Sequence, residues 1–191
     1  ISFEHMTSSR FLNWMERSFA FDAFIEAQDN GFRPGISCFN SFLEERATWA
    51  IGLFKETRSI LGWNVGDGEA QVVGRLTALP IYAHEGRCLV HVGLGCAYGG
   101  VDDDQARYRT RPLIRNGPAV LHNIIAEARF TADNQCTLVP ELMIVWGPWQ
   151  IGAEWYGQWA YDAVPLTGRQ FNRGTWFGQG YYVEVLYFLT G

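Results

Sequence analysis

Most of this chain alternates between apolar residues and polar or small residues with a period of two. In the stretch 71–79, for example, Val72 and Leu76 alternate with Gln71, Arg75 and Thr77. Because successive side chains of a β-strand point to opposite faces, such a pattern predicts strands with one apolar face and one polar face. The period of an amphipathic helix, 3.6 residues, is not sustained over most of the sequence, which therefore predicts an all-β fold.

The alternation predicts about nine strands, most of them about 10 residues long, which is the length of a tilted membrane-spanning β-strand. Both short turns and longer loops separate these strands, as in antiparallel up-and-down hairpins. The segment 1–30 has no clear period and is predicted to be irregular. The predicted strands are 31–42, 47–56, 68–79, 87–98, 105–112, 122–131, 136–146, 150–161 and 180–190.

Alternation alone does not say which face of the sheet meets water. In a soluble sandwich or barrel the apolar face is inside, whereas in an outer-membrane barrel it meets lipid and the polar face lines the lumen. Two features favour the membrane. Aromatic residues such as Trp146 and Trp149 flank predicted turns, as in the aromatic belts of membrane interfaces, and Lys55 is the only lysine among 15 basic residues.

Arginines occupy every second position of the stretch QARYRTRPL, namely Arg107, Arg109 and Arg111. In a strand they share one face at steps of about 6.6 Å. Arginine pairs with phosphate oxygens, and a row of weak sites lets an ion move on, so the three predict an anion path. The net charge of −5 gives no reason to expect nucleic-acid binding.

Three further arginines, Arg75, Arg87 and Arg129, fall on the polar faces of other predicted strands and would extend this path. The alternative is that the arginines pair with carboxylates across strands and only stabilise the sheet. The carboxylates available for such pairs are Glu127, Glu141, Glu154 and Glu184.

Five segments, in matching order over most of the chain, together resemble the phosphate-selective porin O and P family. They are MTSSRFLNWMERS (6–18), VVGRLTALPIYAHEGRCLVHVGLGCAY (72–98), VDDDQARYRTRP (101–112), MIVWGPWQIGAEWY (143–156) and GYYVEVLYFLTG (180–191).

The resemblance implies an outer-membrane porin of a Gram-negative-type bacterium, a sixteen-stranded transmembrane β-barrel that is usually a homotrimer. Small anions, phosphate among them, would diffuse passively through an arginine-lined lumen. Residues 1–191 would be one partial barrel domain, with the hairpins at 31–191, and the remaining strands would be missing. The resemblance also places a constriction in 1–30, lined or braced by Ser8, Ser9, Arg10 and Arg17; the alternative is a packed loop end with a Glu16–Arg17 pair.

Two departures bear on the solute. Phosphate selectivity in the family implies lysines at the pore mouth, but the chain has only Lys55, and the acidic run 101–104 precedes the arginine strand. A general, weakly anion-selective porin is therefore an equal expectation. The alternatives from other classes are a soluble β-sandwich that binds or cleaves carbohydrate, with Glu154 and Glu184 as a carboxylate pair, and a soluble ligand-binding barrel.

No enzymatic activity, cofactor or metal site is expected, because the four histidines lack the spacing of metal ligands. The four cysteines likewise have no metal-like or C-x-x-C spacing and are predicted to act as small apolar residues.

Overall fold

The computed structural model describes residues 6–7, 32–33, 35–55, 69–101, 104–110, 126–166 and 174–189. All nine predicted strands are present in these ranges as β3–β11, so the all-β prediction is confirmed. Within the same residues, no helix is long and apolar enough to cross a membrane. The strands are β1 (Met6–Thr7), β2 (Phe32–Arg33), β3 (Gly35–Phe42), β4 (Ala47–Lys55), β5 (Ala70–Ala83), β6 (Cys88–Gly100), β7 (Gln105–Thr110), β8 (Ala126–Thr131), β9 (Asn134–Trp146), β10 (Trp149–Pro165) and β11 (Gly174–Tyr187).

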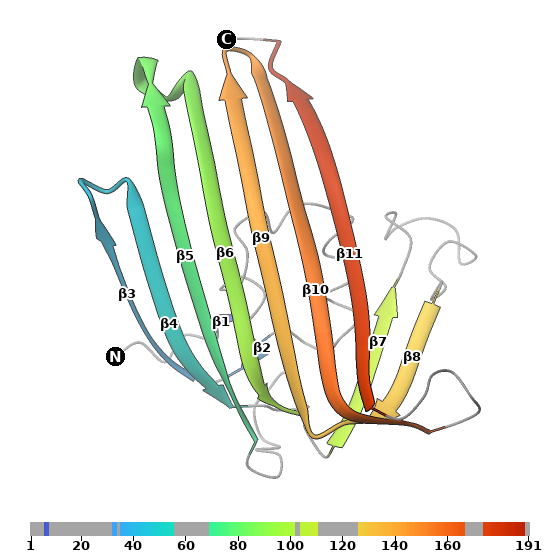
Figure 1. Ribbon diagram of the computed structural model, residues 1–191. Coiled ribbons are helices and arrows are strands. Elements are labelled where there is room, and N and C mark those ends of the chain that lie inside the picture. Colours follow the sequence, from blue (N-terminus) through green and yellow to red (C-terminus); the bar gives the residue numbers. More distant parts are fainter. Residues whose placement is uncertain are drawn as a thin grey trace.

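Seven of these strands form a broad antiparallel sheet, in the order β3-β4-β5-β6-β9-β10-β11, which we call the main sheet (Figure 1). Several strands are longer than the predicted length; β10 has 17 residues and β5 has 14. Within the described residues the sheet does not close on itself, because β3 pairs only with β4 and β11 only with β10.

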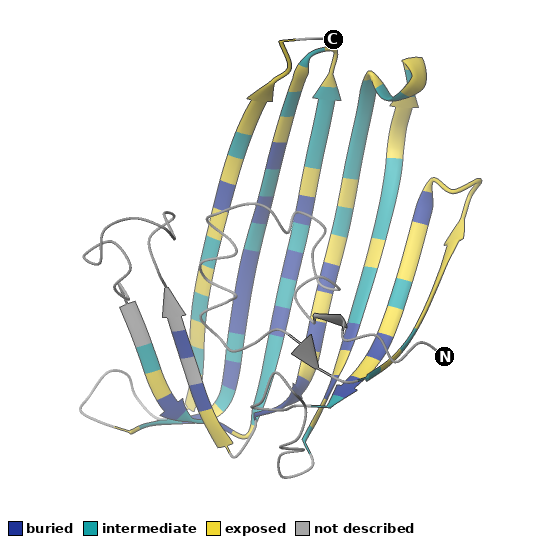
Figure 2. Ribbon diagram, turned by 180° about the vertical axis from the view of Figure 1, so that it is seen from behind, coloured by how far each residue is buried: buried dark blue, intermediate teal, exposed yellow. Residues whose placement is uncertain are grey.

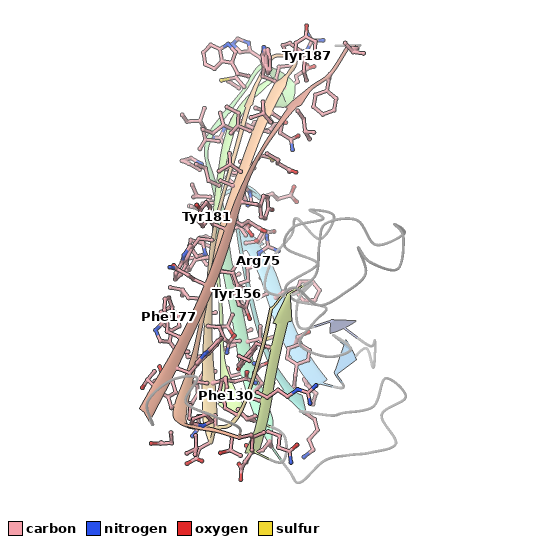
Figure 3. The ribbon with its side chains drawn as sticks, turned by 90° about the vertical axis from the view of Figure 1, so that its right-hand side faces the viewer. Arg75, Phe130, Tyr156, Phe177, Tyr181 and Tyr187 are labelled. Carbon is pink, nitrogen blue, oxygen red and sulfur yellow. The ribbon has the colours of Figure 1, made fainter. Side chains whose placement is uncertain are left out.

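The strands β7 and β8 form a hairpin that does not take the place predicted for it. An up-and-down order would put both strands in the wall between β6 and β9, but β6 pairs directly with β9, from Cys88–Trp146 to Gly100–Asn134. The β7–β8 hairpin instead lies over one face of the main sheet, on the side toward which that sheet curves (Figures 2 and 3). Alternation identifies strands but not their neighbours, which is why the sequence did not predict this departure.

Burial on the two faces of the main sheet is the reverse of the usual pattern in soluble proteins, where apolar side chains are buried and polar ones exposed. On its apolar face, large side chains are exposed, such as Leu53 at 55% and Val183 at 67%. Tyr181 and Phe177 also lie on this face, on the side away from the hairpin (Figure 3). The opposite, polar face is partly buried and holds the buried polar side chains Gln71, Thr137, Glu141, Glu154 and Gln158, whereas Thr48 on the same face is exposed.

Two prolines interrupt the hydrogen-bonded ladders of the main sheet. Proline lacks an N–H donor, so it is tolerated in sheets mainly at edges and bulges. The register between β5 and β6 shifts between Ala78 and Ile81, which flank Pro80. The pairing of β9 with β10 runs to Glu141 and resumes at Leu138, and so skips Pro140.

Candidate functional site

Two rows of aromatic side chains lie near the ends of the apolar face, and a further register pair, Trp155 with Tyr181, lies between them. At the end of the sheet that carries the β9–β10 turn, Trp149 pairs in register with Trp146 and Tyr187, and the Trp149 and Tyr187 ring centroids are 4.8 Å apart. Toward the other end, Trp159 pairs in register with Phe177, and the centroids of these two rings are 4.9 Å apart. Cys136 and then Tyr98 continue this second row onto β9 and β6.

The two aromatic rows are well separated along the strands. Trp149 and Trp159 lie ten positions apart on β10. This is about 33 Å along the strand, or about 25 Å along the axis of a barrel whose strands tilt by about 40°. Between the rows, the described apolar-face positions of β4–β6 and β9–β11 hold no Asp, Glu, Lys or Arg. The polar Gln179 on this face accepts a hydrogen bond from the Trp155 indole at 3.0 Å.

On the polar face, Arg75, His91 and Glu141 converge from three neighbouring strands. The Glu141 Oε1 atom lies 2.5 Å from Nη2 of Arg75 and 2.7 Å from Nε2 of His91. Arg75 and Glu141 belong to β5 and β9, which β6 separates, so their side chains span two strand spacings, about 10 Å. They meet over Gly95 and Gly93, their register partners on β6.

Gly93 leaves room for this ion pair, because a Cβ atom there would overlap the Glu141 side chain unless that side chain moved. We expect Gly93→Ala to displace Glu141 and to lower the free energy of unfolding by about 1–3 kcal/mol, the cost of leaving a buried polar group without its partner. Gly74→Ala is the matched control, since its Cβ would meet Cys96 Sγ at 3.5 Å, an ordinary contact. Urea unfolding of both variants measures the difference; equal stability would contradict this role for Gly93.

A second carboxylate, Glu154, is directly opposite Glu141 in the register of β10 and β9. Its Oε2 atom accepts a hydrogen bond from the Tyr182 hydroxyl at 2.7 Å. Among the described residues, Nε of Arg75, Oε2 of Glu141 and Oε1 of Glu154 are buried without a hydrogen-bond partner.

A network of amides and hydroxyls continues the polar face toward the hairpin. The Gln158 side chain is fully buried, and its Oε1 accepts hydrogen bonds from the hydroxyls of Thr137 at 2.6 Å and Tyr156 at 2.7 Å. Its Nε2 donates to the Tyr108 hydroxyl at 3.3 Å, and that hydroxyl donates to Oε1 of Gln135 at 2.9 Å. Tyr108 belongs to β7, so this network joins the hairpin to the main sheet.

The hairpin packs its apolar face on the polar face of the main sheet. The Tyr108 ring stacks on Trp176 of β11, with centroids 4.8 Å apart and an interplanar angle of 2°. Phe130 of β8 also contacts Trp176, at 5.1 Å between centroids. Small residues of β10, Ala160 and Ala163, leave room for this cluster and are themselves buried.

The structure places the predicted arginine row on this hairpin in part. Arg107 and Arg109 lie in β7, where they pair in register with Arg129 and Glu127 of β8. Arg129 is exposed, between Ala128 and Phe130, which pack toward the main sheet. The side chains of Arg107 and Arg109 lie outside the described residues, as do Arg111, Ser8, Ser9, Arg10 and Arg17.

The other two predicted arginines are not brought to the hairpin. Arg75 makes an ion pair with Glu141. This agrees with the alternative prediction that the arginines pair with carboxylates across strands. Arg87 is exposed at the end of the sheet, where its carbonyl accepts a hydrogen bond from the Gly147 N–H at 2.7 Å. The sequence did not predict that His91 or Tyr108 belongs to the site. The alternation predicts the face of the strand on which each lies, but not the residues that each contacts.

All four cysteines are free thiols, and all lie on the apolar face, where small apolar residues are expected. Each pairs in register with an apolar-face residue of the neighbouring strand. The pairs are Cys38–Ile51, Cys88–Trp146, Cys96–Leu138 and Cys136–Trp159.

A comparison of the chain with protein-family models, curated proteins and solved structures found no match.

Proposed function

We propose that this chain forms part of the wall of a porin in the outer membrane of a Gram-negative-type bacterium, through which small anions diffuse passively. The observation that carries the proposal is the uncharged apolar face, bounded by two aromatic rows whose separation corresponds to about 25 Å along a barrel axis. Lipid would cover this face. The polar face, with the hairpin on it, would line the lumen.

The exposure of the apolar face favours a membrane wall over a soluble carbohydrate-active sandwich. A sandwich buries such a face between two sheets, whereas Leu76 is 53% exposed and Val183 is 67% exposed. Within the described residues, the outer edges of β3 and β11 pair with no further strand; such edges are costly in lipid, so we propose that further strands close the barrel. The family resemblance adds a homotrimer to this proposal.

The hairpin is the proposed source of the preference for anions. Among the described residues, the polar face of the main sheet carries Arg75 against Glu141, Glu154 and Glu184. That balance is negative and would favour cations. The arginines of β7 and β8 would therefore have to outweigh it, and the proposed solutes are small anions such as phosphate. Passive diffusion needs neither catalysis nor a cofactor.

Fractionation and planar-bilayer recording test the proposal. We expect the protein to copurify with the outer membrane and to conduct ions, with a reversal potential in a salt gradient that favours anions. A protein that stays soluble without detergent, or that gives no conductance, would contradict the porin. Conductance that favours cations would agree with a pore but would contradict the proposed preference for anions.

The native thiols provide a test of which face meets lipid. Cys38 and Cys96 are exposed on the apolar face, so in outer-membrane vesicles we expect a charged, membrane-impermeant maleimide to fail to label them, because lipid excludes the reagent; the same reagent should label both thiols once the protein is unfolded in urea. Glu45→Cys, in the exposed β3–β4 turn, is the control that the charged reagent should label. Mass spectrometry locates the adducts. Efficient labelling of Cys96 by the charged reagent would place this face in water.

A further inference from the structure

We propose that Tyr108 is the positioning residue that fixes the arginine-bearing hairpin at one height on the main sheet, and so sets the anion preference of the lumen. This inference rests on the proposed porin function.

The backbone holds the described part of the hairpin to the main sheet only at its base. In the described residues, β8 and β10 share two residue pairs, Thr131–Val164 and Phe130–Pro165, both at the base of the hairpin. Proline has no N–H, so it donates no hydrogen bond to this short ladder. Side chains must therefore fix the rest of the hairpin.

Tyr108 supplies both kinds of contact that such an attachment needs. Its side chain is 5% exposed, its ring stacks on Trp176 of β11, and its hydroxyl bonds to Gln135 of β9 and Gln158 of β10. The three partners come from three adjacent strands of the main sheet, so together they define the height and the lateral position of Tyr108.

Because Tyr108 is a sequence neighbour of two arginines, its position on the main sheet also determines where their backbone lies. Tyr108 stands between Arg107 and Arg109, and neighbouring Cα atoms are about 3.8 Å apart. Any shift of Tyr108 on the sheet therefore shifts the backbone of both arginines. Arg107 is also the register partner of Arg129, so the same attachment places the arginine of β8.

A tyrosine is needed because phenylalanine would keep the ring stack but lose the hydroxyl. The fully buried Gln158 would then lose the Tyr108 hydroxyl as an acceptor, and Gln135 would lose a donor. We expect Tyr108→Phe to loosen the hairpin partly and Tyr108→Ala to release it.

Planar-bilayer recording of the full-length protein in a potassium chloride gradient tests the inference. If two arginines move from about 7 Å to about 14 Å from the ion path, the ratio of anion to cation permeability falls roughly three-fold or more. We expect this fall in Tyr108→Ala, with higher conductance, and a smaller fall in Tyr108→Phe. Thr77→Val is the matched control: it removes a hydroxyl of the polar face that bonds to Thr48, on β5 and β4, which carry none of the three partners of Tyr108.

The outcomes separate this inference from the proposed function. If the unmodified protein does not conduct ions, both the proposed porin function and the positioning role of Tyr108 are wrong. Conductance and selectivity in Tyr108→Ala equal to those of the unmodified protein would overturn the positioning role alone, as would an equal effect of Thr77→Val. If Tyr108→Ala does not assemble, Tyr108→Phe and Trp176→Leu each remove half of the attachment. Both are then expected to lower the anion preference, and unmodified selectivity in both would overturn the inference.

Discussion

Arginine in place of Val92 is expected to destabilise the protein in a bilayer by about 2–4 kcal/mol, the cost of a cation on the lipid face of a barrel at the membrane midplane. Val92 is 39% exposed on the apolar face of β6, between Ala78 of β5 and Leu142 of β9. Through Leu142 its row continues to Ala153 of β10, which lies about midway between the two aromatic rows.

The same substitution separates the two environments proposed for this face. On a soluble sheet, an exposed valine tolerates arginine within about 0.5 kcal/mol. Val92→Leu controls for packing, and Thr48→Arg places the same charge on an exposed polar-face position of β4. Urea unfolding in lipid vesicles, followed by tryptophan fluorescence, gives the three values. If Val92→Arg is as stable as Thr48→Arg, the apolar face does not meet lipid.

The strands and their two faces follow from the sequence because alternation records them directly. Val72 and Leu76 are exposed on β5, while Gln71 is buried on its other side, and this division repeats on β6, β9 and β10. The same pattern gives the apolar faces of β7 and β8, since Tyr108 and Phe130 are buried. A face is a local property, so one strand is enough to predict it.

The neighbours of each strand are not local, and there the sequence was insufficient. The period of two is the same whether β6 pairs with β7 or with β9, so the displaced hairpin was not predicted. The ion pair of Arg75 with Glu141 depends on that adjacency and on Gly93 between the two side chains. From the sequence alone, Glu141 is only one of four carboxylates with which the arginines could pair.

Removal of Arg107, Arg109 and Arg111 together is expected to abolish the preference for anions. An anion about 7 Å from one arginine gains about 0.6 kcal/mol in a water-like dielectric and about 2.4 kcal/mol at an effective dielectric constant of 20. Each arginine would therefore raise the local concentration of anions by roughly 3- to 50-fold. Without them, the glutamates of the polar face would prevail and the pore would favour cations.

The triple Arg→Ala variant and the three single variants, recorded in a dilute potassium chloride gradient where screening is weak, measure this contribution. We expect each single variant to reduce anion conductance and the triple variant to reverse the sign of the reversal potential. Arg87→Ala is the matched control, because Arg87 lies at the end of the sheet, beside the β9–β10 turn. Unchanged selectivity in the triple variant would favour a structural role, for which the register pair Arg109–Glu127 is the first candidate. The sign of the potential thus decides between an anion path and an ion-paired hairpin.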